Sequence, residues 1–180
     1  MNAMNTHYPE PTRIESVNRH TLAVVVDNEP GALARIAGLF SGRGYNIESL
    51  TVSETEEARH LSRITIVTTG TNAVIDQIKA QLDRLVPVHR VVDLTLQGQA
   101  LERELCLVKV AGTGEHRSEA LRLASAFGAR TLDATLNSFV FELTGSTEEI
   151  DRFIRLLSVI GLVEISRTGI AAMGRGAEPL

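Results

Sequence analysis

The residues best suited to do chemistry are two asparagines and a glycine close to a predicted helix start. Asn28 and Gly31 lie in a run of turn formers at residues 27–31, and Asn46 follows the helix that this run precedes. The first N–H groups of a helix have no partner inside the helix and, with the helix dipole, they favour a carboxylate. Side-chain amides donate to a carboxylate and also accept from an ammonium group. These residue types therefore suit the binding of a free amino acid.

An apolar boundary completes this candidate site. The backbone N–H groups of Gly31, Ala32 and Leu33 would face the carboxylate, while Leu33 and Ile47 would bound a small apolar pocket. In the alternative interpretation, Asn28 only caps the helix and Asn46 only occupies a turn. The residues by themselves leave both interpretations open.

Patterns typical of catalysis or metal binding do not occur in the chain. The five histidines are scattered, and neither a G-x-S-x-G elbow nor a Walker A motif is present. Cys106, the one cysteine, lies in an apolar run and is expected to be a buried strand residue. Gly112 and Gly114 resemble the start of a dinucleotide motif, but Arg117 replaces its third glycine. We therefore predict no catalytic centre, and no metal or cofactor bound by this chain.

The composition restricts the partners. The chain has 180 residues, with 18 Lys and Arg against 22 Asp and Glu and a formal charge of −4, which is unfavourable for binding nucleic acid or an anionic membrane. No apolar run approaches the roughly 18–20 residues that cross a bilayer, and residues 1–19 lack the apolar core of a secretion signal. We expect a cytoplasmic protein without nucleic-acid or membrane partners.

Apolar periodicity predicts the order βαββαβ in the first half of the chain. The segment Ser53–Glu57 is acidic and is predicted to be a hairpin loop. An antiparallel sheet results, with both helices on one face and the other face or an edge free for pairing with another copy. The predicted strands are residues 22–26, 45–52, 64–66 and 88–96, and the predicted helices cover residues 33–40 and 74–85.

The same order recurs in the second half at an offset of 75 residues, which pairs Gly70-Thr71 with Gly145-Ser146. Ser146 and Glu149 form a capping box before the last predicted helix. We predict an α+β fold of two ferredoxin-like βαββαβ domains. The chain divides into a flexible extension (1–19), a first domain (20–97), a second domain (98–170) and a tail (171–180). The second-half strands are predicted at 105–110, 131–135, 139–141 and 162–166, with helices at 120–127 and 146–157.

A βαββαβ domain is also the topology of RNA-recognition modules, which stack bases on exposed aromatic rings of the central strands. The second half offers Phe139 and Phe141, but its first strand has no aromatic residue and the chain is acidic. Both rings are more simply interpreted as core residues.

Several segments resemble the small, regulatory subunit of acetolactate synthase, also called acetohydroxyacid synthase. They are D-N-E-P-G-A-L at residues 27–33, R-G-Y-N-I-E-S-L-T-V at 43–52, L-S-R-I-T-I at 61–66, E-L-C-L-V-K-V at 104–110 and R-T-G-I at 167–170. The resemblance covers residues 20 to about 175. It implies that the first domain is an ACT domain and the second a related C-terminal regulatory domain.

This resemblance implies a role in the biosynthesis of valine, isoleucine and leucine. In the family, a large catalytic subunit uses thiamine diphosphate, Mg²⁺ and FAD to condense pyruvate with a second 2-oxo acid. The small subunit activates it and confers feedback inhibition by valine, with leucine or isoleucine as the effector in other members. The small subunit is thus expected to have no catalytic centre and to bind none of these cofactors.

The resemblance also implies a homodimer with valine between two ACT domains. Carried over by motif position, one chain supplies Asn28, Gly31, Ala32 and Leu33, and its partner supplies Asn46 and Ile47. The equivalent loop of the second domain, residues 111–115, lacks the N-E-P-G pattern and is not expected to hold valine. The alternative function is a free-standing ACT-domain amino-acid sensor that acts on another partner.

Overall fold

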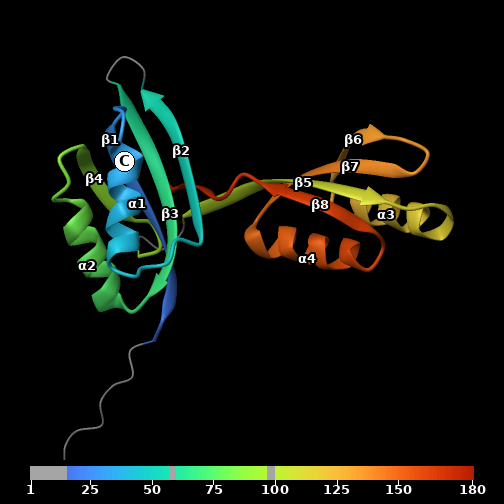
Figure 1. Cartoon of the computed structure of the whole chain (residues 1–180), viewed down its shortest axis with the longest axis horizontal. Helices are drawn as coiled ribbons and strands as arrows, with labels where there is room; N and C mark the ends of the chain where they lie inside the picture. Colours follow the sequence, from blue (N-terminus) through green and yellow to red (C-terminus); the bar gives the residue numbers. More distant parts are fainter. Residues whose placement is uncertain (1–15, 57–59, 97–99) are drawn as a thin grey trace, which may run out of the picture.

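The computed structural model describes residues 16–56, 60–96 and 100–180, which form two units of helices and antiparallel strands joined end to end (Figure 1). The predicted extension lies outside the described residues up to residue 15, but Asn18 and Arg19 already belong to the first strand. The first unit contains β1 (Asn18–Asp27), α1 (Ala32–Gly42), β2 (Ser49–Glu56), β3 (Leu61–Gly70), α2 (Asn72–Leu82) and β4 (Val88–Asp93).

The second unit repeats this order and adds one short strand. It contains β5 (Leu101–Ala111), α3 (Gly114–Ala126), β6 (Arg130–Ala134), β7 (Ser138–Gly145), α4 (Thr147–Ser158), β8 (Leu162–Arg167) and β9 (Ala171–Met173). The sheet orders are β2-β3-β1-β4 and β6-β7-β5-β8, and the paired strands are antiparallel. The predicted α+β fold with two βαββαβ units is thus confirmed.

Strand alternation places both helices of the first unit on one face of its sheet (Figure 1). Leu22, Val24 and Val26 of β1 pack in a buried cluster with Ile36 of α1 and Ile78 of α2. Burying one large aliphatic side chain contributes about 1.5–3 kcal/mol, so each of these residues stabilises the packing of the helices on the sheet.

The opposite face of the first sheet is covered by the chain itself. Ala23 and Val67 form a second buried cluster with Ile170 and Ala172, which come from the end of the chain. The sequence predicts that this face is free for pairing between halves or copies, and that residues 171–180 are an unpatterned tail. Instead, residues 171–173 form β9, because two apolar side chains of this region gain burial under the first sheet.

The core of the second unit is built on aromatic side chains. The rings of Phe139 and Phe141 lie 5.3 Å apart and are 4% and 0% exposed, and Phe153 of α4 packs on Phe141. The core interpretation of the two β7 rings is confirmed, and they offer no surface on which RNA bases could stack. Cys106 is fully buried as predicted, and burial raises the pKa of its thiol.

Three predictions for the first unit are wrong. The second strand begins at Ser49 rather than residue 45. Residues 53–56 of the acidic stretch continue this strand instead of forming a loop, with Ser53 opposite Arg63 and Glu54 opposite Ser62, and residue 57 lies outside the described residues. Polar residues are tolerated there because β2 is an edge strand with one face in solvent. Leu33, predicted on the core face of the first helix, is 42% exposed.

Two helix starts have the capping side chain or the glycine that their local sequence predicts. The Ser146 hydroxyl accepts from the backbone N–H of Glu149 at 3.2 Å, which confirms the predicted cap of α4. Gly31 precedes α1 with a φ of +89°, a left-handed conformation that favours glycine.

The two units are connected by a pair of antiparallel strands. The first residues of β5, Leu101–Arg103, pair with β9, so the chain leaves the first unit and returns to it along the same path (Figure 1). The second unit is therefore held by two segments rather than by one linker.

Candidate functional site

The start of α1 is an open helix end. The first helical bond runs from the N–H of Arg35 to the carbonyl of Gly31 at 3.0 Å, and no side chain caps the helix. The N–H of Ala32, predicted to face the carboxylate, donates instead to the carbonyl of Glu29 at 3.3 Å, because residues 29–32 form a turn before the helix. Among the described residues, the N–H groups of Gly31 and Leu33 have no hydrogen-bond acceptor. Asn28 is exposed and donates its backbone N–H to the carbonyl of His60 at 2.6 Å. The interpretation of Asn28 as a helix cap is wrong, and its side-chain amide has no hydrogen-bond partner among the described residues.

The charges around this loop are paired. Glu29 binds Arg35 at 2.6 Å, and Asp27 contacts His89 at 2.6 Å. Because Glu29 has a guanidinium partner and Asp27 a hydrogen-bonded imidazole, neither carboxylate lacks a partner beside the helix end, which keeps its positive dipole. The electrostatics of the loop are therefore compatible with a carboxylate ligand.

The second group of predicted residues, Asn46 and Ile47, lies between α1 and β2. The carbonyl of Asn46 accepts from the hydroxyl of buried Thr68 at 2.6 Å, which fixes the backbone while its side chain stays exposed. Ile47 is half-buried against the first core. Asn46 thus lies in the loop between α1 and β2, and its carbonyl is hydrogen-bonded to β3.

The structure does not bring the two groups together within one chain. Asn28 follows the end of β1, where Asp27 pairs with Leu61 of β3. Asn46 lies at the other end of β3, because its carbonyl binds Thr68, which pairs with His20 near the start of β1. Seven strand residues separate these positions, or about 23 Å. Figure 1 shows the same relationship, because α1 runs the length of the sheet between the two loops. Ala32, with 5% exposure, and Leu33 lie at the Asn28 end.

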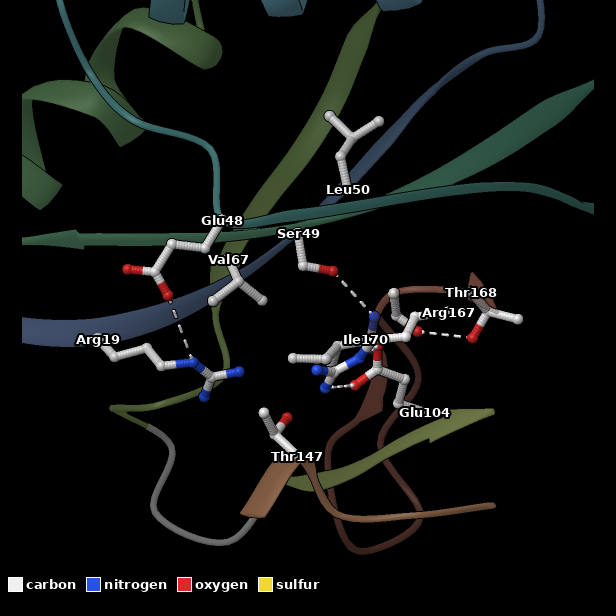
Figure 2. Close-up of a pocket in the computed structure, with 11 residues that line it drawn as sticks. Arg19, Glu48, Ser49, Leu50, Val67, Glu104, Thr147, Arg167, Thr168 and Ile170 are labelled. Atoms are coloured by element: carbon white, nitrogen blue, oxygen red, sulfur yellow. Dashed lines mark hydrogen bonds and ion pairs between the residues drawn. The ribbon is translucent and has the colours of Figure 1, made fainter. Parts of the chain in front are cut away.

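A second feature, which the sequence analysis missed, is a cavity of about 460 Å³ at the junction of the two units (Figure 2). Its apolar wall is formed by side chains of the first sheet and by Ile170. The signal in the sequence was the R-T-G-I segment at residues 167–170, because all four of its residues line the cavity. The lining residues are Arg19, Glu48, Ser49, Leu50, Val67, Glu104, Thr147, Arg167, Thr168, Gly169 and Ile170.

The charged side chains of this junction cavity neutralise one another. Arg167 donates to both carboxylate oxygens of Glu104, at 2.8 and 2.6 Å, and to Asp151 at 2.7 Å. Hydrogen bonding to Glu104 raises the pKa of Arg167. Arg19 lies 3.1 Å from Glu102 and 3.8 Å from Glu48. Within this network the contact between Arg19 and Glu102 links the two units. The Thr147 hydroxyl, which also lines the cavity, is buried and has no hydrogen-bond partner among the described residues.

Within residues 16–56, 60–96 and 100–180, no group of three or more His, Cys, Asp or Glu side chains is placed to hold a metal ion. None of the described helices is both long and apolar enough to cross a bilayer.

Comparison with known proteins identifies close relatives. Residues 22–90 match the family described as "AHAS small subunit-like ACT domain", and residues 103–176 match "Small subunit of acetolactate synthase". The chain is 46% identical over 158 residues to a probable acetolactate synthase small subunit of Archaeoglobus fulgidus, covering 88% of this chain and 98% of the relative. It is 43% identical over 159 residues to the acetolactate synthase isozyme 3 small subunit of Escherichia coli, with 88% and 96% covered. The crystal structure of the acetolactate synthase small subunit from Thermotoga maritima superposes with a TM-score of 0.81 at 36% identity, covering 89% of this chain and 99% of that one.

Proposed function

Because the chain belongs to the family of acetolactate synthase small subunits, we propose that it binds the large catalytic subunit, raises its activity and makes it sensitive to valine. Membership of this family implies a large-subunit partner, and the ACT domain supports a regulatory role. We place thiamine diphosphate, Mg²⁺ and FAD on that catalytic subunit. The contribution of this chain is to bind the effector and to change the activity of its partner.

The proposed valine site lies between the first units of two copies. The N–H groups at Gly31 and Leu33 face the effector carboxylate, and the amides of Asn28 and of Asn46 from the other copy orient its ammonium group. The isopropyl group lies between Leu33 and Ile47 of the other copy. Leucine and isoleucine share this chemistry and are the competing effectors.

One observation carries this proposal: the two groups lie about 23 Å apart at opposite ends of the same sheet. A two-fold axis that places two first units side by side in opposite directions brings the Asn28 end of one copy to the Asn46 end of the other. The operation builds two equivalent sites in each dimer. The exposed Leu33 supports this arrangement, because a contact with the other copy would bury it.

Regulation requires that valine bind one dimer geometry better than another. An effector shifts an equilibrium only by its differential affinity for the two states, and couplings of about 1–3 kcal/mol are typical. Valine that bridges two copies senses their relative position directly. The activating and inhibited states are therefore two geometries of the dimer.

The test is reconstitution with the purified large subunit. We expect the chain to raise acetolactate formation, and valine to reverse this increase. Calorimetric titration of the chain with valine, leucine and isoleucine should give one bound effector per chain. If effector binds while the chain neither copurifies with the large subunit nor changes its activity, the regulatory assignment is wrong and a free-standing amino-acid sensor replaces it.

A further inference from the structure

The backbone of Ile170 is held by β2 through both of its polar groups. Its N–H donates to the Ser49 hydroxyl at 2.9 Å, and its carbonyl accepts from the Thr51 hydroxyl at 2.9 Å. Ser49 and Thr51 are two positions apart and therefore lie on the same face of the strand. The chain end is thus attached to the first sheet at a defined register.

Gly169 permits this close approach. Its φ is +82°, and a Cβ atom there would lie 2.8 Å from the hydroxyl oxygen of Ser49 and 3.0 Å from the methyl carbon of Thr51. A side chain at this position would strain the backbone and displace the Ser49 and Thr51 side chains that hold Ile170. The glycine of the R-T-G-I motif is therefore required by the contact between the units.

Apolar burial reinforces the attachment. Ile170 and Ala172 are 4% and 7% exposed and pack on Ala23 and Val67 of the first sheet. The guanidinium of Arg63 in β3 donates to the carbonyl of Ala172 at 2.5 Å. Three polar contacts and one small apolar cluster thus join this segment to three adjacent strands, β2, β3 and β1.

The same segment is part of the second unit at its other side. The N–H of Thr168 donates to the carbonyl of Leu105 at 3.0 Å, and the preceding Arg167 binds Glu104. Residues 171–173 pair with Leu101–Arg103 at the start of β5. A movement of residues 168–172 must therefore move β5, the central strand of the second unit.

The proposed effector residues lead directly into this contact. Asn46 and Ile47 are followed by Glu48, whose N–H donates to the carbonyl of Val67, and then by Ser49. Val67 also contacts Ile170 in the buried cluster. A shift of the 46–47 loop on valine binding thus reaches Ile170 through two adjacent strands. The junction cavity of about 460 Å³ beside this contact leaves space for the units to reorient.

We propose that residues 168–172 are the coupling segment, which transmits valine occupancy from the first unit to the second through Ser49 and Thr51. The proposal rests on the proposed function, because it requires an effector at the 46–47 loop. It assigns the two hydroxyls a positioning role and makes no claim that they contact the effector. Interdomain contacts of modest size allow relative motion, which a signal of this kind needs.

The test uses the double variant Ser49→Ala/Thr51→Val, which removes both hydroxyls with little change in volume. The matched control is Ser53→Ala/Thr55→Val, the same substitutions four positions further along β2, where both side chains are exposed. Each variant is assembled with the large subunit. Valine affinity is measured by calorimetry, and inhibition is measured through acetolactate formation.

We expect the Ser49/Thr51 variant to bind valine within about threefold of the wild-type affinity. The inhibition factor is the ratio of the activity without valine to the activity at saturating valine. In the Ser49/Thr51 variant this factor should be at least fivefold smaller than in the wild type and approach one, since allosteric couplings of this kind are typically 5- to 150-fold. The control should retain wild-type binding and inhibition. In hydrogen exchange, valine should change the protection of residues 101–103 and 171–173 in the wild type but not in the Ser49/Thr51 variant.

Full inhibition of the Ser49/Thr51 variant would overturn the coupling role. Loss of its valine binding would also overturn it, because the hydroxyls would then belong to the effector site. If the double variant does not fold, Ser49→Ala is measured by the same criteria. Failure of the wild type itself to bind valine would instead remove the proposed function, so the two failures are distinguishable.

Discussion

The guanidinium of Arg167 forms a two-pronged hydrogen bond with the carboxylate of Glu104, from Nε at 2.8 Å and from Nη2 at 2.6 Å. Glu104 is only 5% exposed, whereas 31% of the Arg167 side chain is exposed. A buried carboxylate is costly unless a cation and hydrogen bonds satisfy it. Arg167 thus offsets the cost of burying the Glu104 carboxylate, at the end of β8 where the coupling segment begins.

Substitution of Arg167 by Met should lower the free energy of unfolding by about 3 kcal/mol, because it leaves the charge of Glu104 buried and unpaired. Urea unfolding followed by circular dichroism measures the change. The control is Lys109→Met, which removes an ion pair with Glu164 whose partners are 46% and 64% exposed. That control should change the unfolding free energy by less than about 1 kcal/mol.

The double variant Glu104→Leu/Arg167→Met separates the two contributions. If the loss in Arg167→Met arises from an unpaired charge, removing the carboxylate should restore part of the stability. A double variant that is less stable than Arg167→Met would contradict this explanation.

Ile170→Ala should lower the free energy of unfolding by about 2–4 kcal/mol, because it leaves a cavity in the cluster between the first sheet and the chain end. Met173, in β9 close to Ile170, is 64% exposed, and Met173→Ala should cost no more than about 0.5 kcal/mol. Thermal and urea unfolding provide the comparison. Equal effects of the two substitutions would mean that the cluster does not hold the chain end in place.

Asn28→Ala should weaken valine binding roughly tenfold or more, because it removes a hydrogen bond to a charged group of the effector. Activation of the large subunit in the absence of valine should be unchanged. Calorimetry and the valine dependence of acetolactate formation measure the two effects. Asn137→Ala, in the β6–β7 turn, is a control that changes an exposed asparagine of the other unit. Lost activation with unchanged inhibition would contradict the proposed site.

Cys106 should react with thiol reagents at pH 8 at least tenfold more slowly in the folded protein than in urea. Burial raises its pKa, and the thiolate is the reactive form. The raised pKa means that folding favours the neutral thiol, so its contribution to stability is complete below the ordinary thiol pKa of about 8.5. This contribution is lost as the pH rises through the folded-state pKa. Cys106→Ala should abolish this part of the decrease in unfolding free energy at alkaline pH. A reaction as rapid in the folded protein as in urea would instead show that the thiol is accessible.

Much of each unit follows from local patterns. The alternation of Leu22, Val24 and Val26 predicts which face of β1 is buried, since neighbouring side chains of a strand point to opposite sides. The capping of α4 by Ser146 needs only residues within one turn. The repeat of these patterns in the second half is enough to predict the same fold twice.

Polarity was a misleading signal at the edge of the first sheet. Ser53 and Glu54 have the composition of a loop, yet they continue β2 because Arg63 and Ser62 lie opposite them and solvent covers the other side. Similarly, apolar spacing places Leu33 on the inner face of α1, although it lies at the open helix end and is 42% exposed.

The sequence by itself determined the two βαββαβ units, their buried faces and the motifs of the proposed effector site, because each depends on residues close together in the chain. The tertiary structure alone decided that the Asn28 and Asn46 ends lie far apart, and that Ile170 returns to β2. Contacts between residues about 120 positions apart leave no periodic pattern in either segment. They form because the free second face of the first sheet gains burial from whatever apolar residues the fold brings to it.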